Sequence, residues 1–275
     1  MPLNALETSF AGDRTARRTG IIPFIVGGSP SIQSMQESLL ALAKLGCTAI
    51  EVGLPFSDPI ADGPVIAQAM HEVLAGSVTV GRVLAGIREV APSCAAPLVA
   101  MSSQSLVERC GMASFASQLA QAGFSGLITP DGDLDGSESL RVACRGAGLA
   151  TPWLVAPRTD ATRARRLVRA SSGFVYVLSR AGLTGAGGGM DRLESRVRDL
   201  RSLTDLPLAV GFGIGTAAQV REATKSADAA IIGSALVRAM TAAGPSGAAK
   251  AAAGLLAELK TGLSARSVST AAERR

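Results

Sequence analysis

The feature that most constrains this 275-residue chain is a repeated alternation of short apolar runs with longer segments of helical periodicity. Gly, Pro, Ser or Asp follows most of the runs, so each run predicts a buried strand and each following segment a helix. Repeated strand–helix units predict a parallel sheet, either closed as a barrel or open and doubly wound. The expected strands are 21–26, 49–54, 98–102, 126–129, 153–156, 174–178, 208–210 and 229–232.

The positions of the polar segments favour the closed barrel. Acidic and glycine-rich segments come directly after the expected strands, and a (β/α)8 (TIM) barrel gathers its active site at the carboxyl ends of its strands. A helix within residues 2–17, with Leu3, Leu6 and Phe10 on its apolar side, is expected to cap the bottom of this barrel. We predict one TIM-barrel domain over residues 1–265 and a frayed polar tail over 266–275.

Charge and cysteine usage exclude several function classes. The net charge of +5 is modest and suits an anionic small substrate. Arginines at helical spacing in 158–169 favour a solvated helix face; nucleic-acid binding is the alternative, but no aromatic or glycine-rich RNA motif accompanies them. His71 is the only histidine, which argues against a Ser-His-Asp triad and a histidine-based metal site. We expect no metal and no nucleic-acid partner.

Nothing in the chain is typical of a secreted or membrane protein. The four cysteines, at 47, 94, 110 and 144, have neither metal-binding nor redox spacing. The N-terminus does not have the pattern of a signal peptide, and no apolar run reaches the length of a membrane span. We therefore expect a cytoplasmic protein with free thiols and no membrane contact.

Two acids lie at the end of the second expected strand. Alternation within residues 49–54 points the carboxylate of Glu51 into the interior, where a charge is unfavourable. The segment that follows, PFSDP, ends the strand and brings Asp62 back in a loop. Two carboxylates in different environments can divide acid and base roles. The alternative is an acid neutralised by a core Arg or Lys, and residues 51–64 contain neither.

Glycines follow the last two expected strands. Residues 211–216 read GFGIGT, and Gly233 and Ser234 follow the eighth strand. Backbone N–H groups at glycines and at helix N-termini bind anions, and a phosphate site between the last two loops is common in such barrels. Tight turns are the alternative for the first motif alone, but the pair favours phosphate, with Gly213, Gly233 and Ser234 as candidate ligands.

Residues 51–64, EVGLPFSDPIADGP, resemble nearly residue for residue the signature of the tryptophan synthase alpha-chain family, and the likeness extends from about Gly20 to Ala239. The resemblance implies a retro-aldol cleavage of indole-3-glycerol phosphate to indole and glyceraldehyde 3-phosphate, without a cofactor. In that reaction, the resemblance implies that Glu51 would protonate the indole C3 carbon and that Asp62 would stabilise the indole N–H. It also implies a pyridoxal-phosphate-dependent beta subunit as partner, in an alpha2beta2 complex.

The resemblance assigns further residues. Tyr176 would lie beside the substrate, Thr184 would orient Asp62, and Gly185 would donate to phosphate. The expected apolar walls of the indole pocket are Phe24, Leu127, Phe212 and Ile232.

The chain departs from the family in three places. Ser102, Ser103 and Gln104 stand where a Tyr and an Asn are common, near the ring pocket and the beta-subunit contact, and the glycines 187–189 predict a looser lid. After the fourth strand, Gly132 and Asp133 stand where Pro-rich or apolar residues are usual, at another surface that meets the partner. Three interpretations remain open: an alpha subunit feeding indole to a beta subunit, a stand-alone lyase of a secondary pathway, and a catalytically poor regulatory subunit that binds a phosphorylated ligand.

Overall fold

The computed structural model describes residues 4–57, 63–179, 189–211 and 213–263, and the expected tail therefore lies outside the described residues. Eight parallel strands run in the order β4-β3-β2-β1-β8-β7-β6-β5. Their carboxyl ends share one face, as the predicted fold requires. The strands are β1 (Gly20–Val26), β2 (Ile50–Gly53), β3 (Leu98–Met101), β4 (Phe124–Ile128), β5 (Trp153–Val155), β6 (Val175–Leu178), β7 (Leu208–Gly211) and β8 (Ala229–Ile232).

The sheet closes between its two outer strands, β4 and β5. A parallel bridge joins Gly126 to Ala150 just before β5. The amide of Leu127 donates to Ala150 O at 2.9 Å, and the amide of Ala150 donates to Ser125 O at 2.9 Å. The predicted (β/α)8 barrel is therefore confirmed, and each expected strand lies within two residues of its predicted bounds.

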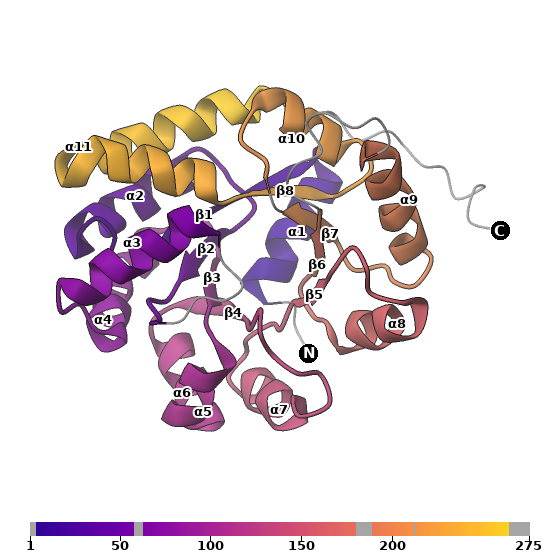
Figure 1. Cartoon of the computed structure of the whole chain (residues 1–275), viewed down its shortest axis with the longest axis horizontal. Helices are drawn as coiled ribbons and strands as arrows, with labels where there is room; N and C mark the ends of the chain where they lie inside the picture. Colours follow the sequence, from indigo (N-terminus) through magenta and orange to yellow (C-terminus); the bar gives the residue numbers. More distant parts are fainter. Residues whose placement is uncertain (1–3, 58–62, 180–188, 212, 264–275) are drawn as a thin grey trace.

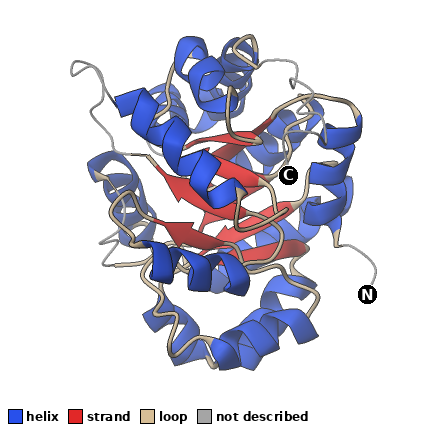
Figure 2. Ribbon diagram, turned by 90° about the vertical axis from the view of Figure 1, so that its right-hand side faces the viewer, coloured by secondary structure: helices blue, strands red, loops and turns tan. Residues whose placement is uncertain are grey.

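Helices surround the strands on the outside (Figures 1 and 2). Most were expected from their apolar periodicity, but α5 was not, because its seven residues are too short to display that pattern. In the described part of the chain, no helix has the length and apolar character needed to cross a membrane. The helices are α1 (Ala5–Thr15), α2 (Ile32–Lys44), α3 (Pro64–Ala75), α4 (Val80–Val90), η1 (Ala91–Ser93), α5 (Gln104–Cys110), α6 (Met112–Gln121), α7 (Glu138–Gly146), α8 (Ala161–Ala170), α9 (Gly189–Arg201), α10 (Ala217–Thr224) and α11 (Ser234–Lys260).

The first helix closes one end of the barrel, as predicted. Asn4 caps α1 by accepting from the amide of Glu7 at 3.0 Å. Its buried residues Leu6 and Phe10 belong to the apolar cluster inside the barrel, where the rings of Phe10 and Phe174 lie 5.5 Å apart. The opposite, carboxyl end of the strands is therefore the end available for a site.

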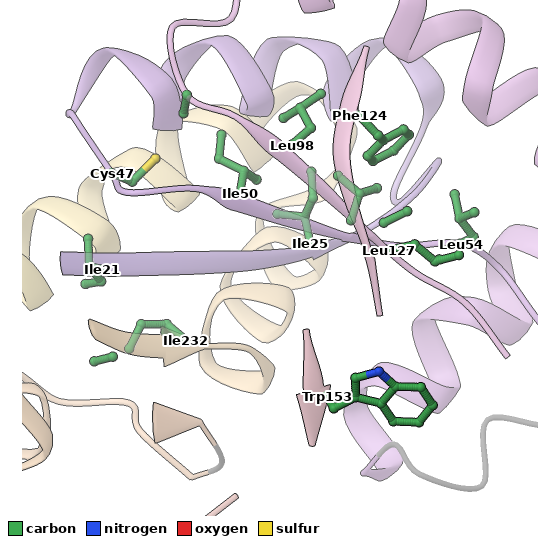
Figure 3. Packing of buried hydrophobic residues seen from close by; sticks show 14 of the residues in the cluster. Ile21, Ile25, Cys47, Ile50, Leu54, Leu98, Phe124, Leu127, Trp153 and Ile232 are labelled. Carbon is green, nitrogen blue, oxygen red and sulfur yellow. The ribbon is translucent and has the colours of Figure 1, made fainter. Parts of the chain in front are cut away.

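Alternation along each strand divides the core into an inner and an outer layer. On β2, Ile50 and Val52 pack in the outer layer, between strands and helices, whereas Ala49 belongs to the inner cluster. Glu51 and Gly53 share the inner face with Ala49 because side chains two residues apart point the same way. Figure 3 shows part of the outer layer, with Ile25, Ile50 and Leu98 on neighbouring strands.

Candidate active site

Glu51 is a fully buried acid on the inner face of β2. It is flanked in register by Phe24 on β1 and Val99 on β3, and its exposed fraction is 0%. Among the described residues, neither carboxylate oxygen has a hydrogen-bond partner. The alternative of an acid neutralised by a core Arg or Lys therefore finds no support in the described part of the chain.

Burial raises the pKa of Glu51 from its ordinary value of 4.5 to about 8, because an ionised carboxylate is poorly solvated there. Near neutral pH this carboxyl group carries its proton in a large fraction of molecules. A group that titrates close to the working pH can donate a proton and recover it within one reaction cycle. The local chemistry of Glu51 is that of a general acid and base.

Two aromatic side chains lie on the same inner face, each against a strand glycine. A Cβ atom placed on Gly53 would lie 2.6 Å from Cζ of Phe24, and a Cβ atom on Gly211 would collide with the hydroxyl of Tyr176. The absent side chains of these glycines make room for the rings. The structure thus places two predicted substrate-binding residues, Phe24 and Tyr176, inside the barrel with Glu51.

The structure corrects two predicted wall residues. Leu127 and Ile232 belong to the outer layer (Figure 3), so their side chains point away from the inner face that carries Glu51. Two adjacent residues belong to the inner cluster instead: Ile128, which follows Leu127, and Ile231, which precedes Ile232. Both strand segments are apolar on both faces, and the sequence pattern therefore does not show which residue points inward. In the structure, the register carries the inward direction of Glu51 from strand to strand, and it identifies Ile128 and Ile231 as the inward-facing residues.

Four further predicted residues, Asp62, Thr184, Gly185 and Phe212, lie outside the described residues. The carboxyl group of Glu51 and the rings of Phe24 and Tyr176 are therefore the described part of the predicted catalytic and ring-binding groups.

The glycine segment after β7 divides into two parts. Gly213 has a φ of 78°, in the left-handed region that favours glycine. The amides of Gly215 and Thr216, in contrast, donate to Oε1 of Gln219 at 2.9 and 3.1 Å, within a capping box that starts α10. These two amides serve the helix and are not free for an anion. The Thr-x-x-Gln spacing of that capping box was visible in the sequence.

The helix after β8 begins without such a cap. Its N-cap residue is Gly233, and no side chain in the described part of the chain makes a capping hydrogen bond to α11. Uncapped amides and the positive end of the helix dipole suit an anion. A Cβ atom on Gly233 would lie 4.0 Å from Cδ1 of Phe24, so this helix start is close to the aromatic ring. Along neighbouring strands β2, β1 and β8, the structure therefore brings together an acid, an aromatic ring and an open helix N-terminus.

The rim of β3 and β4 carries the residues at which the sequence departs from the family that it resembles. Ser103 caps α5 by accepting from the amide of Leu106 at 3.3 Å, and Asp131 Oδ1 accepts from the amide of Gln104 at 2.9 Å. Ser102 is buried. These contacts tie the β3 and β4 loops together and give Ser103 and Asp131 capping roles that the sequence did not indicate.

Comparisons with known proteins agree with one another. The family model described as "Tryptophan synthase alpha chain" matches residues 10–264. The tryptophan synthase alpha chain of Gloeobacter violaceus is 40% identical over 241 residues, 86% of either chain, and that of Methanosarcina mazei is 40% identical over 230 residues, 82% of either chain.

Solved structures show the same likeness. A structure of Mycobacterium tuberculosis tryptophan synthase superposes with a TM-score of 0.86 at 34% identity, covering 97% of this chain and 100% of that one. A tryptophan synthase a2b2 complex from Pyrococcus furiosus superposes with a TM-score of 0.82 at 28% identity, covering 89% and 99%.

Proposed function

The chain belongs to the tryptophan synthase alpha-chain family, and on that premise we propose that it cleaves indole-3-glycerol phosphate to indole and glyceraldehyde 3-phosphate. The observation that carries the proposal is the buried carboxyl group of Glu51, which has a raised pKa and no hydrogen-bond partner among the described residues. A retro-aldol cleavage of this kind needs one group that protonates a ring carbon and then removes a hydroxyl proton. Glu51 has the chemistry for both steps.

A single group, Glu51, can carry the proton through both steps of the reaction. Protonated Glu51 donates its proton to the indole C3 carbon, which makes the ring an electron acceptor. The carboxylate left behind then takes the proton of the hydroxyl group on the adjacent side-chain carbon as the C–C bond breaks. The bond electrons return to the ring, the carbonyl of glyceraldehyde 3-phosphate forms, and Glu51 is protonated again. We assign Asp62 to the indole N–H, as the family resemblance implies.

The phosphate group of the substrate fits the carboxyl ends of β7 and β8. The open N-terminus of α11 at Gly233 and Ser234, and the left-handed backbone at Gly213, support this assignment. The ring of Phe24 lies between this helix start and β2. In the proposed complex the indole ring therefore contacts Phe24, Tyr176, Ile128 and Ile231, and the phosphate binds beyond it.

We also propose that the chain works with a pyridoxal-phosphate-dependent beta subunit that consumes the indole. Support comes from the relatives, among them the Pyrococcus furiosus protein, whose structure is described as an a2b2 complex with mutual activation.

The four cysteines are free in the structure. The cytoplasmic location expected from the sequence stays a prediction.

The test is the release of indole from indole-3-glycerol phosphate, measured with and without a beta subunit. We expect weak turnover alone, a strong rise with the partner, and a loss of about 10³-fold in Glu51→Gln, since general acid–base groups contribute on this order. Glu37→Gln is the matched control, because Glu37 is exposed on α2, where it accepts from Gln33.

Each other result has a defined meaning. High turnover without a partner would support a stand-alone lyase. Binding of glycerol 3-phosphate without any turnover would support a regulatory subunit. Full activity in Glu51→Gln would remove Glu51 from the acid–base role.

A further inference from the structure

Gly53 has no conformational need to be glycine. It is the last residue of β2, two positions after Glu51 on the same face, and its φ is not in the positive region that favours glycine. The surroundings of Gly53 leave no room for a larger side chain. A Cβ atom there would lie 2.6 Å from Cζ and 3.0 Å from Cε2 of Phe24, and 3.0 Å from Cε of Met70. Real Cβ atoms do not approach neighbours as closely as 2.6 Å, so a Cβ atom at this position would force the ring of Phe24 to move.

The ring that fills this space belongs to the residue beside Glu51. Phe24 stands directly beside Glu51 in the β1–β2 register, but its ring ends against Gly53, two residues closer to the carboxyl end of β2. The tip of the ring is therefore displaced from the level of Glu51 towards the carboxyl ends of the strands. Phe24 is itself buried, in a cluster that includes Met70 and Val73 of α3 and Val237 of α11.

We propose that Gly53 and Met70 form a slot that holds the ring of Phe24 over Glu51, which makes both of them positioning residues for the catalytic acid. Gly53 supplies the floor of the slot, and the methyl group of Met70 supplies one wall. The ring keeps water from the carboxyl group on the side from which substrate enters. The turnover readouts below rest on the proposed function, but the shielding of Glu51 does not.

The slot has a measurable consequence for proton affinity. Among the described residues, burial is the cause of the raised pKa of Glu51. On the inner face of the described strands, Tyr176 of β6 is the other titratable side chain; no charged residue of α3 or α11 belongs to the cluster around the ring. A displaced ring would admit water and lower the pKa of Glu51 towards 4.5.

The first experiment needs no substrate. The infrared carbonyl band of a protonated carboxyl group is followed against pH, and Glu51→Gln identifies the part that belongs to Glu51. We expect a midpoint near 8 in the unmodified protein. In Gly53→Ala and in Phe24→Leu the midpoint should fall by at least about one pH unit. Gly126→Ala is the matched control: this β4 glycine also faces inward, but its Cβ atom would meet Ala150, Leu6 and Val99 at 3.3–3.5 Å.

The second experiment asks whether Gly53 acts through the ring. Gly53→Ala should lower kcat by about tenfold or more, whereas inhibition by glycerol 3-phosphate should change less than about twofold. In the Phe24→Leu background the same substitution should have little further effect, because the group it displaces is already gone. Additive effects of the two substitutions would overturn the proposal.

The outcomes separate this proposal from the proposed function. An unchanged infrared midpoint in folded Gly53→Ala overturns the slot even if turnover falls. Absence of turnover in the unmodified protein, together with the expected shift in midpoint, overturns the lyase and keeps the slot. If Gly53→Ala does not fold, as judged by circular dichroism, Met70→Ala replaces it. That variant removes one wall and should move the midpoint in the same direction by a smaller amount, and no movement overturns the proposal.

Discussion

The two ends of the barrel treat a buried carboxyl group in opposite ways. At the amino ends of the strands, Asp13 accepts from Nε of Arg18 and from Oγ1 of Thr48, both at 2.6 Å. Asp228 accepts from the amide of Leu208 at 2.7 Å and pairs with Arg201. At the carboxyl ends, Glu51 is more deeply buried than either and has no partner among the described residues.

The difference separates stability from function. A buried carboxylate that is hydrogen-bonded and ion-paired ties segments together, and here it joins α1 to the start of β2 and α9 to the starts of β7 and β8. A buried carboxyl group without partners lowers the stability of the fold whenever it is ionised. A chain retains such a group where the reaction needs its proton. The amino ends of the strands therefore hold the fold, and the carboxyl ends are where we propose the chemistry, as is usual in barrels of this class.

The sharpest test of this contrast is the pH dependence of stability. Because the pKa of Glu51 is raised from 4.5 to about 8 in the folded protein, the folded state holds a proton that the unfolded state releases. Its contribution is fully present below pH 4.5 and is lost as the pH rises through about 8. Each pH unit in this window contributes about 1.4 kcal/mol, so the total is several kcal/mol.

Glu51→Gln should remove that dependence. Urea unfolding at a series of pH values between 5 and 9 measures it, and the variant should be more stable than the unmodified protein at the alkaline end. Equal slopes in both proteins would mean that Glu51 has an ordinary pKa, and the contrast between the two ends would fail.

The sequence located the acid but not the whole wall around it. Glu51 marks the inner face of its strand because it interrupts an apolar run. The two-residue period of side-chain direction then assigns the other residues of that strand to the inner or the outer face. Ile231 and Ile232 are chemically identical, so nothing in the sequence shows which of them points inward. Leu127 and Ile128 present the same difficulty. The one-residue shift arose only where both faces of a strand are apolar, which is normal in a parallel barrel.

Contacts between segments that are distant along the chain could not be predicted from the sequence either. The capping helix was predictable because Leu6 and Phe10 are spaced by one helical turn. The slot at Gly53 was not, since a strand glycine has several explanations and only the rings and helices packed around it decide among them. The partners of Asp13 and Asp228 likewise come from segments far along the chain.

A smaller effect on the unfolding free energy is expected for a substitution at the amino ends of the strands. Asp228→Asn keeps an acceptor for the amide of Leu208 but removes the charge that pairs with Arg201, whose side chain is 35% exposed and can be solvated in part. We expect a loss of about 2 kcal/mol in unfolding free energy, less than the full value for a buried pair, with kcat of indole release unchanged. A fall in kcat at constant stability would place Asp228 in the chemistry and break the division between the two ends.

The smallest effect is expected for an acid on the surface. Oδ1 of Asp133 lies 4.0 Å from Nη2 of Arg163, and both side chains are about half exposed or more, so water screens the pair. Asp133→Asn should change the unfolding free energy by less than about 0.5 kcal/mol, and added salt should abolish even that difference. Urea unfolding at low and high ionic strength is the measurement. A loss above about 1 kcal/mol would show that this rim of the barrel carries stability too, and the distinction between its two ends would then depend on burial rather than on which end of the strands an acid occupies.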